Sequence, residues 1–100
     1  MDKKAVIKLS KAYGKVLKSN FEIEKIFLFG SYMNGKAHEE SDIDIAIVFN
    51  DFKNKMDLQM ELLKIRRNFD TRIEPHLFRK NEFNYDNPLA SEVIKYGKEI

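Results

Sequence analysis

Two aspartates, Asp42 and Asp44, are the residues best suited to chemistry, because one residue separates them at the start of a predicted strand. Side chains alternate between the faces of a strand, so both carboxylates are expected on one face while Ile43 and Ile45 point into the core. Neighbouring carboxylates repel each other unless a cation neutralises them. Hard oxygen ligands of this kind suit Mg²⁺ or Mn²⁺, which keep part of their water and bridge to phosphate oxygens. The pair therefore predicts a metal site.

A second feature, Gly30-Ser31, directly follows a buried apolar segment. Glycine lets the backbone approach a ligand closely, and the following amides and the Ser31 hydroxyl can donate hydrogen bonds to phosphate. Taken alone, an acid pair often caps a turn or faces solvent, and a glycine-serine dipeptide often marks an ordinary turn. A third acidic residue lies in a third predicted strand, and the three features together favour a site for phosphate and metal.

The spacing of apolar side chains predicts the elements that must position these residues. Apolar residues at three- and four-residue steps predict an amphipathic helix within residues 1–20, whose lysines lie on the opposite side. Strands are predicted at 22–29, 43–49 and 72–78, and further helices at 55–69 and 88–96, the last with Asn87 as its cap and Gly97 as its stop. Residues 31–41 form a polar connection, and Pro75 predicts that the third strand is an edge or carries a bulge. The middle helix is expected to bury a stripe that includes Met56 and Met60. The fold class is α+β, with a small mixed sheet flanked by helices.

Gly30-Ser31, Gly35 and Ser41-Asp42-Ile43-Asp44 resemble the signature of the polymerase-β-like nucleotidyltransferase superfamily, and specifically its minimal nucleotidyltransferase (MNT) group. The interval 32–41 between Gly-Ser and the first aspartate matches the spacing in that family. The resemblance covers essentially the whole chain. It implies the nucleotidyltransferase fold, ATP or another nucleoside triphosphate as donor, Mg²⁺ in a two-metal site, and transfer of a nucleoside monophosphate, AMP if ATP is the donor, to a hydroxyl.

The resemblance also implies roles for individual residues. Gly30 and Ser31 would hold the triphosphate, and Asp42 and Asp44 would bind metals that bridge the α-phosphate and the leaving pyrophosphate. The third family carboxylate, usually an aspartate, falls on Glu74, which would help hold the catalytic metal and orient the acceptor hydroxyl; a solvent-facing strand residue is the alternative interpretation of Glu74. The resemblance thus predicts a catalytic and metal-binding set of Asp42, Asp44 and Glu74.

For two other groups of polar residues, a structural or solvated role is favoured over contact with the site or its ligands. His76 shares the face of Glu74 and could approach the site, but a single histidine near a strand end is more often a structural hydrogen-bonding residue. Arg66 and Arg67 are expected to be solvated at the surface.

Composition limits the remaining possibilities. The chain has 100 residues, 43% hydrophobic and 34% charged side chains, and no cysteine. This size predicts a single minimal nucleotidyltransferase domain over residues 1–100, with no room for a separate substrate domain. Thiol nucleophiles and zinc–thiolate sites are excluded. No apolar run approaches the ~20 residues of a membrane span, so a cytoplasmic protein with no membrane partner is expected.

Two classes of function remain, together with a variant of the first. One is a transferase that modifies a partner macromolecule; the resemblance implies a HEPN-type RNase toxin, which the MNT antitoxin neutralises by adenylylating a tyrosine. The second is a non-catalytic antitoxin or assembly subunit that acts by binding. The variant keeps the chemistry but uses RNA as the acceptor, held by the first helix, because residues 1–20 contain six lysines and one acidic residue. The acid pair favours catalysis, and an oligomer is compatible with each hypothesis.

Overall fold

The computed structural model describes residues 2–100 and contains one four-stranded mixed sheet in the order β3-β2-β1-β4. β1 pairs antiparallel with β2 and with β4, whereas β2 pairs parallel with β3. The elements in chain order are α1 (Lys3–Asn20), β1 (Ile23–Phe29), α2 (Ser31–Asn34), β2 (Ile43–Phe49), α3 (Lys55–Arg66), β3 (Ile73–Arg79), the 3₁₀ helix η1 (Lys80–Glu82), α4 (Pro88–Tyr96) and β4 (Lys98–Glu99). The predicted α+β class with a small mixed sheet is confirmed.

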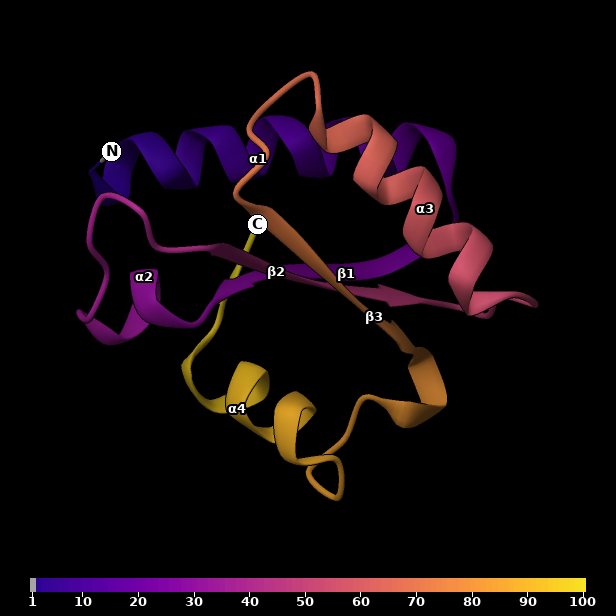
Figure 1. Cartoon of the computed structure of the whole chain (residues 1–100). Helices are drawn as coiled ribbons and strands as arrows, with labels where there is room; N and C mark the ends of the chain where they lie inside the picture. The colour runs from indigo at the N-terminus through magenta and orange to yellow at the C-terminus, as the bar shows by residue number, and fades with distance from the viewer. Residues whose placement is uncertain (1) are drawn as a thin grey trace.

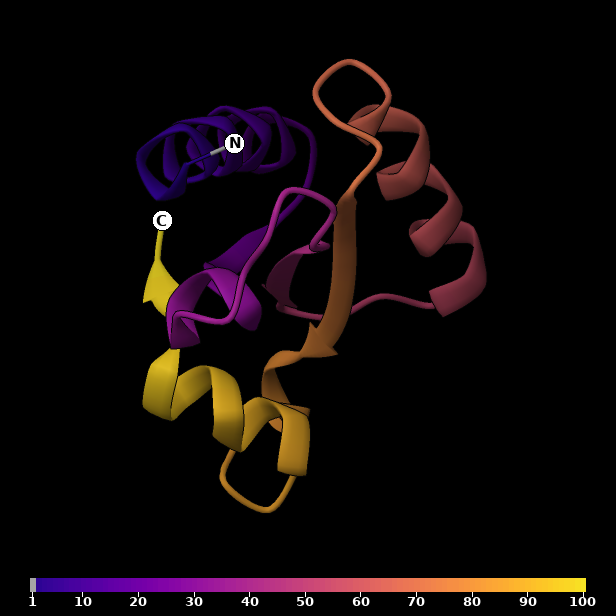
Figure 2. The same ribbon diagram turned by 60° about the vertical axis from the view of Figure 1, so that its left-hand side comes forward.

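The helices cover the two faces of the sheet unequally. α1 and α3 lie on one face and α4 lies on the other, as Figures 1 and 2 show from two directions. The larger core lies under α1 and α3 and includes Val6, Leu17, Ile45 and Leu62. The smaller core lies under α4 and consists of Phe29, Ala46, Val48, Phe78, Ala90 and Val93. Part of the second face therefore has no helix over it.

Local signals set several boundaries where the sequence predicts them. The Asn87 side chain accepts hydrogen bonds from the amides of Leu89 and Ala90, and Pro88 occupies the first turn, where its missing amide proton costs nothing. α4 ends before Gly97, so its predicted limits are confirmed. β2 also has its predicted limits. Among residues 2–100, no helix is both long and apolar enough to cross a membrane.

Pro75 is tolerated because β3 is an edge strand. The Pro75 carbonyl accepts a hydrogen bond of 3.1 Å from Nε2 of Gln59 on α3. The backbone polar groups of Pro75 therefore point away from β2, toward the outer edge of the sheet. The proline nitrogen faces the same edge, and no hydrogen bond to β2 is lost. Nη1 of Arg66 likewise donates to the Ile73 carbonyl at 2.7 Å. The predicted edge position is confirmed, and the expectation that Arg66 is only solvated is wrong.

The predicted buried stripe of the middle helix is wrong at its methionines. Met56 and Met60 are 76% and 52% exposed, whereas Leu62 is fully buried and Leu58 and Ile65 pack against the core. Residues 58, 62 and 65 follow the helical repeat, and a two-residue offset from 56 to 58 turns a side chain by about 200°. Both stripes are apolar, so only contact with the sheet decides which is buried. The helix also ends at Arg66, earlier than predicted.

Three short elements were not predicted. α2 lies within the connection that the sequence predicts as irregular, η1 follows β3, and the two-residue β4 pairs with Phe27 and Leu28 of β1. Segments this short carry no periodic apolar signal, and their contacts with the sheet decide their conformation.

One buried hydrogen bond joins the two helices on the larger core. The Tyr13 side chain is fully buried, and its hydroxyl donates to the Leu62 carbonyl on α3 at 3.1 Å. Burial raises the pKa of Tyr13 well above its ordinary value, so the hydroxyl remains a donor at any physiological pH. The Tyr13 ring also packs edge-on against Phe69.

We expect Tyr13→Phe to lower the free energy of unfolding by about 1 kcal/mol, since the substitution removes this hydrogen bond and keeps the ring. Urea denaturation followed by circular dichroism measures the change. Tyr85→Phe is the matched control, because Tyr85 is 65% exposed. Equal effects of the two substitutions would show that the bond between α1 and α3 adds no stability.

Candidate active site

Asp44, Glu74 and His76 form a cluster at one end of the sheet, with one potential ligand atom from each residue within 4.8 Å of the others. The register between the parallel strands produces this cluster, because Asp44 on β2 lies beside Glu74 on β3. His76 is two residues further along β3 and returns to the same face. Strand pairing therefore brings together two acidic residues and a histidine that are far apart in the chain.

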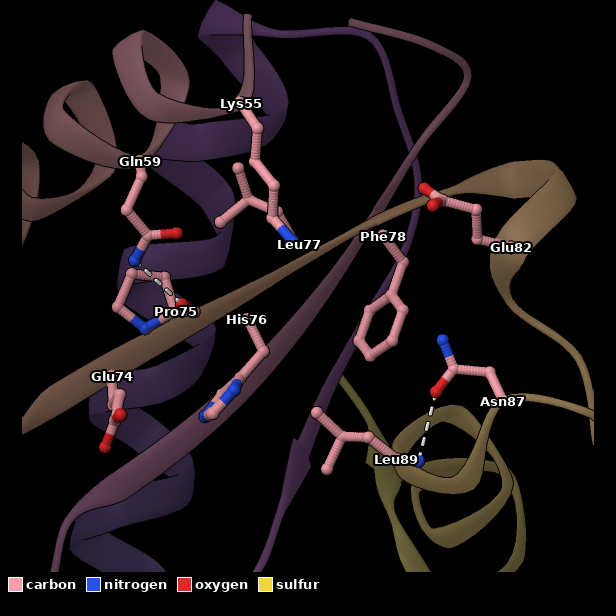
Figure 3. Close-up of a pocket in the computed structure, with 10 residues that line it drawn as sticks. All are labelled: Lys55, Gln59, Glu74, Pro75, His76, Leu77, Phe78, Glu82, Asn87 and Leu89. Carbon is pink, nitrogen blue, oxygen red and sulfur yellow. Dashed lines mark hydrogen bonds between the residues drawn. The ribbon is translucent and has the colours of Figure 1, made fainter.

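The cluster lies on the α4 face of the sheet, beyond the part that α4 covers. Ile43 and Ile45 are fully buried on the opposite face, as the strand alternation predicts. Figure 3 shows Glu74, His76 and Phe78 on one side of β3, and Pro75 and Leu77 on the other. Phe78 packs under α4, whereas the Asp44 and His76 side chains remain 21% and 25% exposed. The open end of this face is thus the part that carries the polar side chains.

Gly30 makes the closest backbone approach to this cluster. Its φ of 78° and ψ of −147° lie in a region that is essentially restricted to glycine. A Cβ atom at this position would overlap Oδ2 of Asp44 and lie 3.1 Å from its Cγ. Both the conformation and the space beside Asp44 therefore require glycine.

Ser31 begins α2 directly after this turn. The first helical hydrogen bonds of α2 run from the amides of Met33 and Asn34 to the Gly30 carbonyl, so the amides of Ser31 and Tyr32 precede them. Amides at this position in a helix have no partner within the helix. The predicted phosphate-binding segment, Gly30 and Ser31, thus lies directly beside Asp44.

The connection from α2 to β2 places Asp42. The buried Ser41 side chain accepts a hydrogen bond of 2.8 Å from the His38 amide, and the Tyr32 hydroxyl donates to the His38 carbonyl at 3.4 Å. Asp42 follows this turn, is exposed, and directly precedes β2. A hydrogen-bonded turn therefore positions the first aspartate.

The clustered carboxylates of the site repel one another. The pKa of Glu74 is raised, first by loss of hydration, and then by a hydrogen bond with Asp42 and by the negative charges of Asp44 and Asp42; His76 opposes these effects. The donor set of carboxylate oxygens and one imidazole nitrogen fits a divalent cation, which would relieve the repulsion.

His76 lies closer to Asp44 than its sequence context predicts. Nε2 of His76 lies 3.1 Å from Oδ1 of Asp44, and the imidazole packs edge-on against the Phe29 ring with 5.1 Å between ring centres. In the sequence, the two-residue spacing between Glu74 and His76 indicated that both side chains lie on one face of the strand. Asp70, the acidic residue shortly before β3, is not part of the cluster: it pairs with Arg72 at 2.8 Å, and the hydrogen bond from Arg72 lowers the pKa of Asp70.

Comparison with known families gives the site its context. The family described as Polymerase beta, Nucleotidyltransferase matches residues 11–100. The chain belongs to this family. The matched segment includes Gly30, Asp42, Asp44 and Glu74, so the cluster lies in the nucleotidyltransferase domain.

Individual relatives share segments of the chain. A Methanocaldococcus jannaschii protein, provisionally named a protein adenylyltransferase, is 49% identical over 59 residues, which are 56% of this chain and 59% of the relative. Protein adenylyltransferase MntA of Thermococcus cleftensis is 42% identical over 40 residues, which are 40% of each chain. The matched segment of each relative is less than two thirds of its own length.

Solved structures resemble the whole nucleotidyltransferase domain. A chain in the crystal structure of a toxin–antitoxin with AMP-PNP has a TM-score of 0.61 and 28% identity, and the match covers 99% of this chain and 72% of the other. A chain in the structure of a tri-AMPylated Shewanella oneidensis HEPN toxin with its MNT antitoxin has a TM-score of 0.62, with 94% and 70% coverage. At 24% identity, this second similarity concerns the fold.

We expect Gly30→Ala to destabilise the nucleotidyltransferase by about 2–4 kcal/mol, because it adds backbone strain and displaces the Asp44 carboxylate. Gly35→Ala is the matched control: Gly35 has a similar φ of 77°, but a Cβ there meets no atom within 4 Å. The control should lose only about 1 kcal/mol. Urea denaturation measures both, and Gly30→Ala should cost less in an Asp44→Ala background. Equal losses in the two glycine variants would contradict the close approach to Asp44.

We also expect Glu74→Gln to raise the thermal midpoint at neutral pH in the presence of EDTA. A carboxyl whose pKa is raised by folding stabilises the native state when protonated, and this contribution is lost as pH rises from its ordinary pKa through the raised value. The advantage of the variant should therefore shrink as pH falls below this window. Calorimetric scans across pH measure it, with Glu92→Gln on α4 as an exposed control. A variant less stable than the parent at neutral pH would disprove the repulsion.

Proposed function

We propose that this nucleotidyltransferase transfers AMP from ATP to a hydroxyl of a partner protein, and that it acts as an antitoxin that modifies a HEPN-type RNase toxin. The observation that carries the proposal is the position of Asp44 and Glu74 beside the Gly30 turn, within a domain of this family. The names of the relatives support adenylyl transfer, and the toxin–antitoxin structure with AMP-PNP supports the donor and the kind of partner.

Each residue has a distinct role in the proposed reaction. The Gly30-Ser31 segment binds the triphosphate through its backbone amides and the Ser31 hydroxyl. Asp42, Asp44 and Glu74 would hold divalent cations, expected to be Mg²⁺, which would supply positive charge to the phosphates. Glu74 orients the acceptor hydroxyl toward the α-phosphorus. A bond forms from this oxygen to the α-phosphorus, the bond to the bridging oxygen breaks, pyrophosphate leaves, and the hydroxyl proton passes to solvent.

An acceptor can approach Glu74 along the outer edge of β3. A cleft of about 370 Å³ lies at this edge between α3 and α4, lined by Glu74, His76, Gln59 and Leu89 among others. Figure 3 shows the Gln59 and Leu89 side chains on opposite sides of the strand. The cleft lies at the molecular surface, which suits an acceptor side chain presented by another macromolecule.

RNA as the acceptor receives less support from this arrangement. The lysine-rich α1 lies on the face of the sheet opposite to α4 (Figure 1). Asp44 and Glu74 lie on the α4 face, because they alternate along their strands with residues of the core under α1 and α3. An RNA bound along the lysines would have the sheet between it and the carboxylates. The basic surface of α1 and the candidate active site are therefore separate.

The test of the proposal is transfer of label from α-labelled ATP to a purified HEPN-type toxin. We expect Asp44→Asn and Asp42→Asn to reduce transfer by at least about a hundredfold, because each removes a ligand charge needed by the cations. Asp86→Asn, in the exposed loop before α4, should retain parental activity. Neutralisation of the toxin by the Asp44→Asn variant as efficiently as by the parent would favour the non-catalytic antitoxin instead.

A further inference from the structure

We propose that His76 is a metal ligand, and that the cation position formed by Asp44, Glu74 and His76 therefore prefers Mn²⁺ to Mg²⁺. The proposal deepens the proposed function, since it concerns the same site. It makes the two-cation site asymmetric: the position beside Glu74 has an imidazole, whereas a position between Asp42 and Asp44 has carboxylates alone.

The spacing of the side chains carries this inference. In an octahedral site with bonds of about 2.1 Å, neighbouring ligand atoms are about 3.0 Å apart, and opposite ones about 4.2 Å. Nε2 of His76 and Oδ1 of Asp44 are 3.1 Å apart, the separation of neighbouring ligands. Asp44, Glu74 and His76 can each place one ligand atom within 4.8 Å of the others. Asp44 and His76 thus already have the spacing of neighbouring ligands, and Glu74 is near enough for its carboxylate to turn toward a shared cation.

The imidazole is held in this orientation by the protein. Phe29 packs edge-on against it, and Phe29 is itself buried and paired with Asp44 in the β1–β2 register. His76 is also on the face of β3 that α4 leaves open, so the ring needs no change of backbone to reach a cation. Nε2 of His76 already faces Oδ1 of Asp44, so the tautomer with its proton on Nδ1 would offer the Nε2 lone pair to a cation beside Asp44.

The ligand chemistry then determines the preference. Carboxylate and water oxygens suit Mg²⁺, which dehydrates reluctantly and binds imidazole poorly. A nitrogen ligand favours first-row transition ions, of which Mn²⁺ also accepts the two carboxylates. If His76 were only a structural partner of Asp44, its removal would weaken both cations alike.

Pulsed electron paramagnetic resonance of the protein with stoichiometric Mn²⁺, without nucleotide, tests this proposal directly. We expect modulation from a directly bound ¹⁴N nucleus, replaced by a ¹⁵N pattern when histidine alone is isotopically labelled. The labelled parent needs no substitution, so the result does not depend on whether a variant folds. Absence of a coupled histidine nitrogen, or failure of Mn²⁺ to bind, would overturn the proposal.

Variants of the two histidines complete the experiment. His76→Gln should abolish the nitrogen signal and reduce the Mn²⁺ over Mg²⁺ affinity ratio roughly tenfold or more, measured by competition titration. His38→Gln is the matched control, because His38 is exposed and lies outside the cluster, and it should change neither readout. An unchanged ratio in His76→Gln would also overturn the proposal. Because these readouts do not require transfer, a protein that binds Mn²⁺ through His76 but modifies no toxin would contradict only the proposed function.

Discussion

The close approach of the Gly30 backbone to the Asp44 carboxylate is the constraint on which the site depends. Oδ2 of Asp44 occupies the space that a side chain at residue 30 would fill, and Oδ1 lies 3.1 Å from His76. The aspartate is therefore held between two strands, β1 through the turn that follows it and β3 through His76. A shift of one residue in either strand pairing would turn the partner side chain to the opposite face. The antiparallel and parallel registers together position the carboxylate.

In this arrangement, the protein only partly neutralises the negative charges of Asp42, Asp44 and Glu74. Loss of hydration and the neighbouring aspartates raise the pKa of Glu74, and the single imidazole only partly opposes them. By contrast, Asp70 has an arginine beside it, which lowers its pKa. Asp70 is thus paired with a cationic side chain, whereas the clustered carboxylates are arranged so that an added cation would stabilise them. The local cost in stability is of the kind expected at a functional site.

The two faces of the sheet have different roles, which allows a short chain to maintain such a site. α1 and α3 cover one face completely enough to form the main core, with Tyr13 and Leu62 joined by a buried hydrogen bond. α4 covers only part of the other face, where Ala90 and Val93 pack on Phe78 and its neighbours. The polar end of that face is not covered by α4 and is accessible to large substrates. Stability thus comes mainly from one side of the sheet and chemistry from the other.

The sequence by itself determined the longer elements and the face of β2 that carries Asp44, because these depend on local signals. Strand alternation at residues 42–45, the Asn87 cap and the glycine-serine turn each act within a few residues, and the predicted limits of β2 and α4 are those observed. The tertiary structure decided the rest. The burial of Leu58 in place of Met56 on α3 depended on which apolar stripe meets the sheet. The nearness of His76 to Asp44 depended on the parallel register of β2 and β3, which joins residues 32 positions apart. Pairing between distant segments leaves no periodic trace in either one. The acidic residues could therefore be proposed as a set only through the family resemblance, and the position of His76 beside Asp44 was decided by the folded sheet.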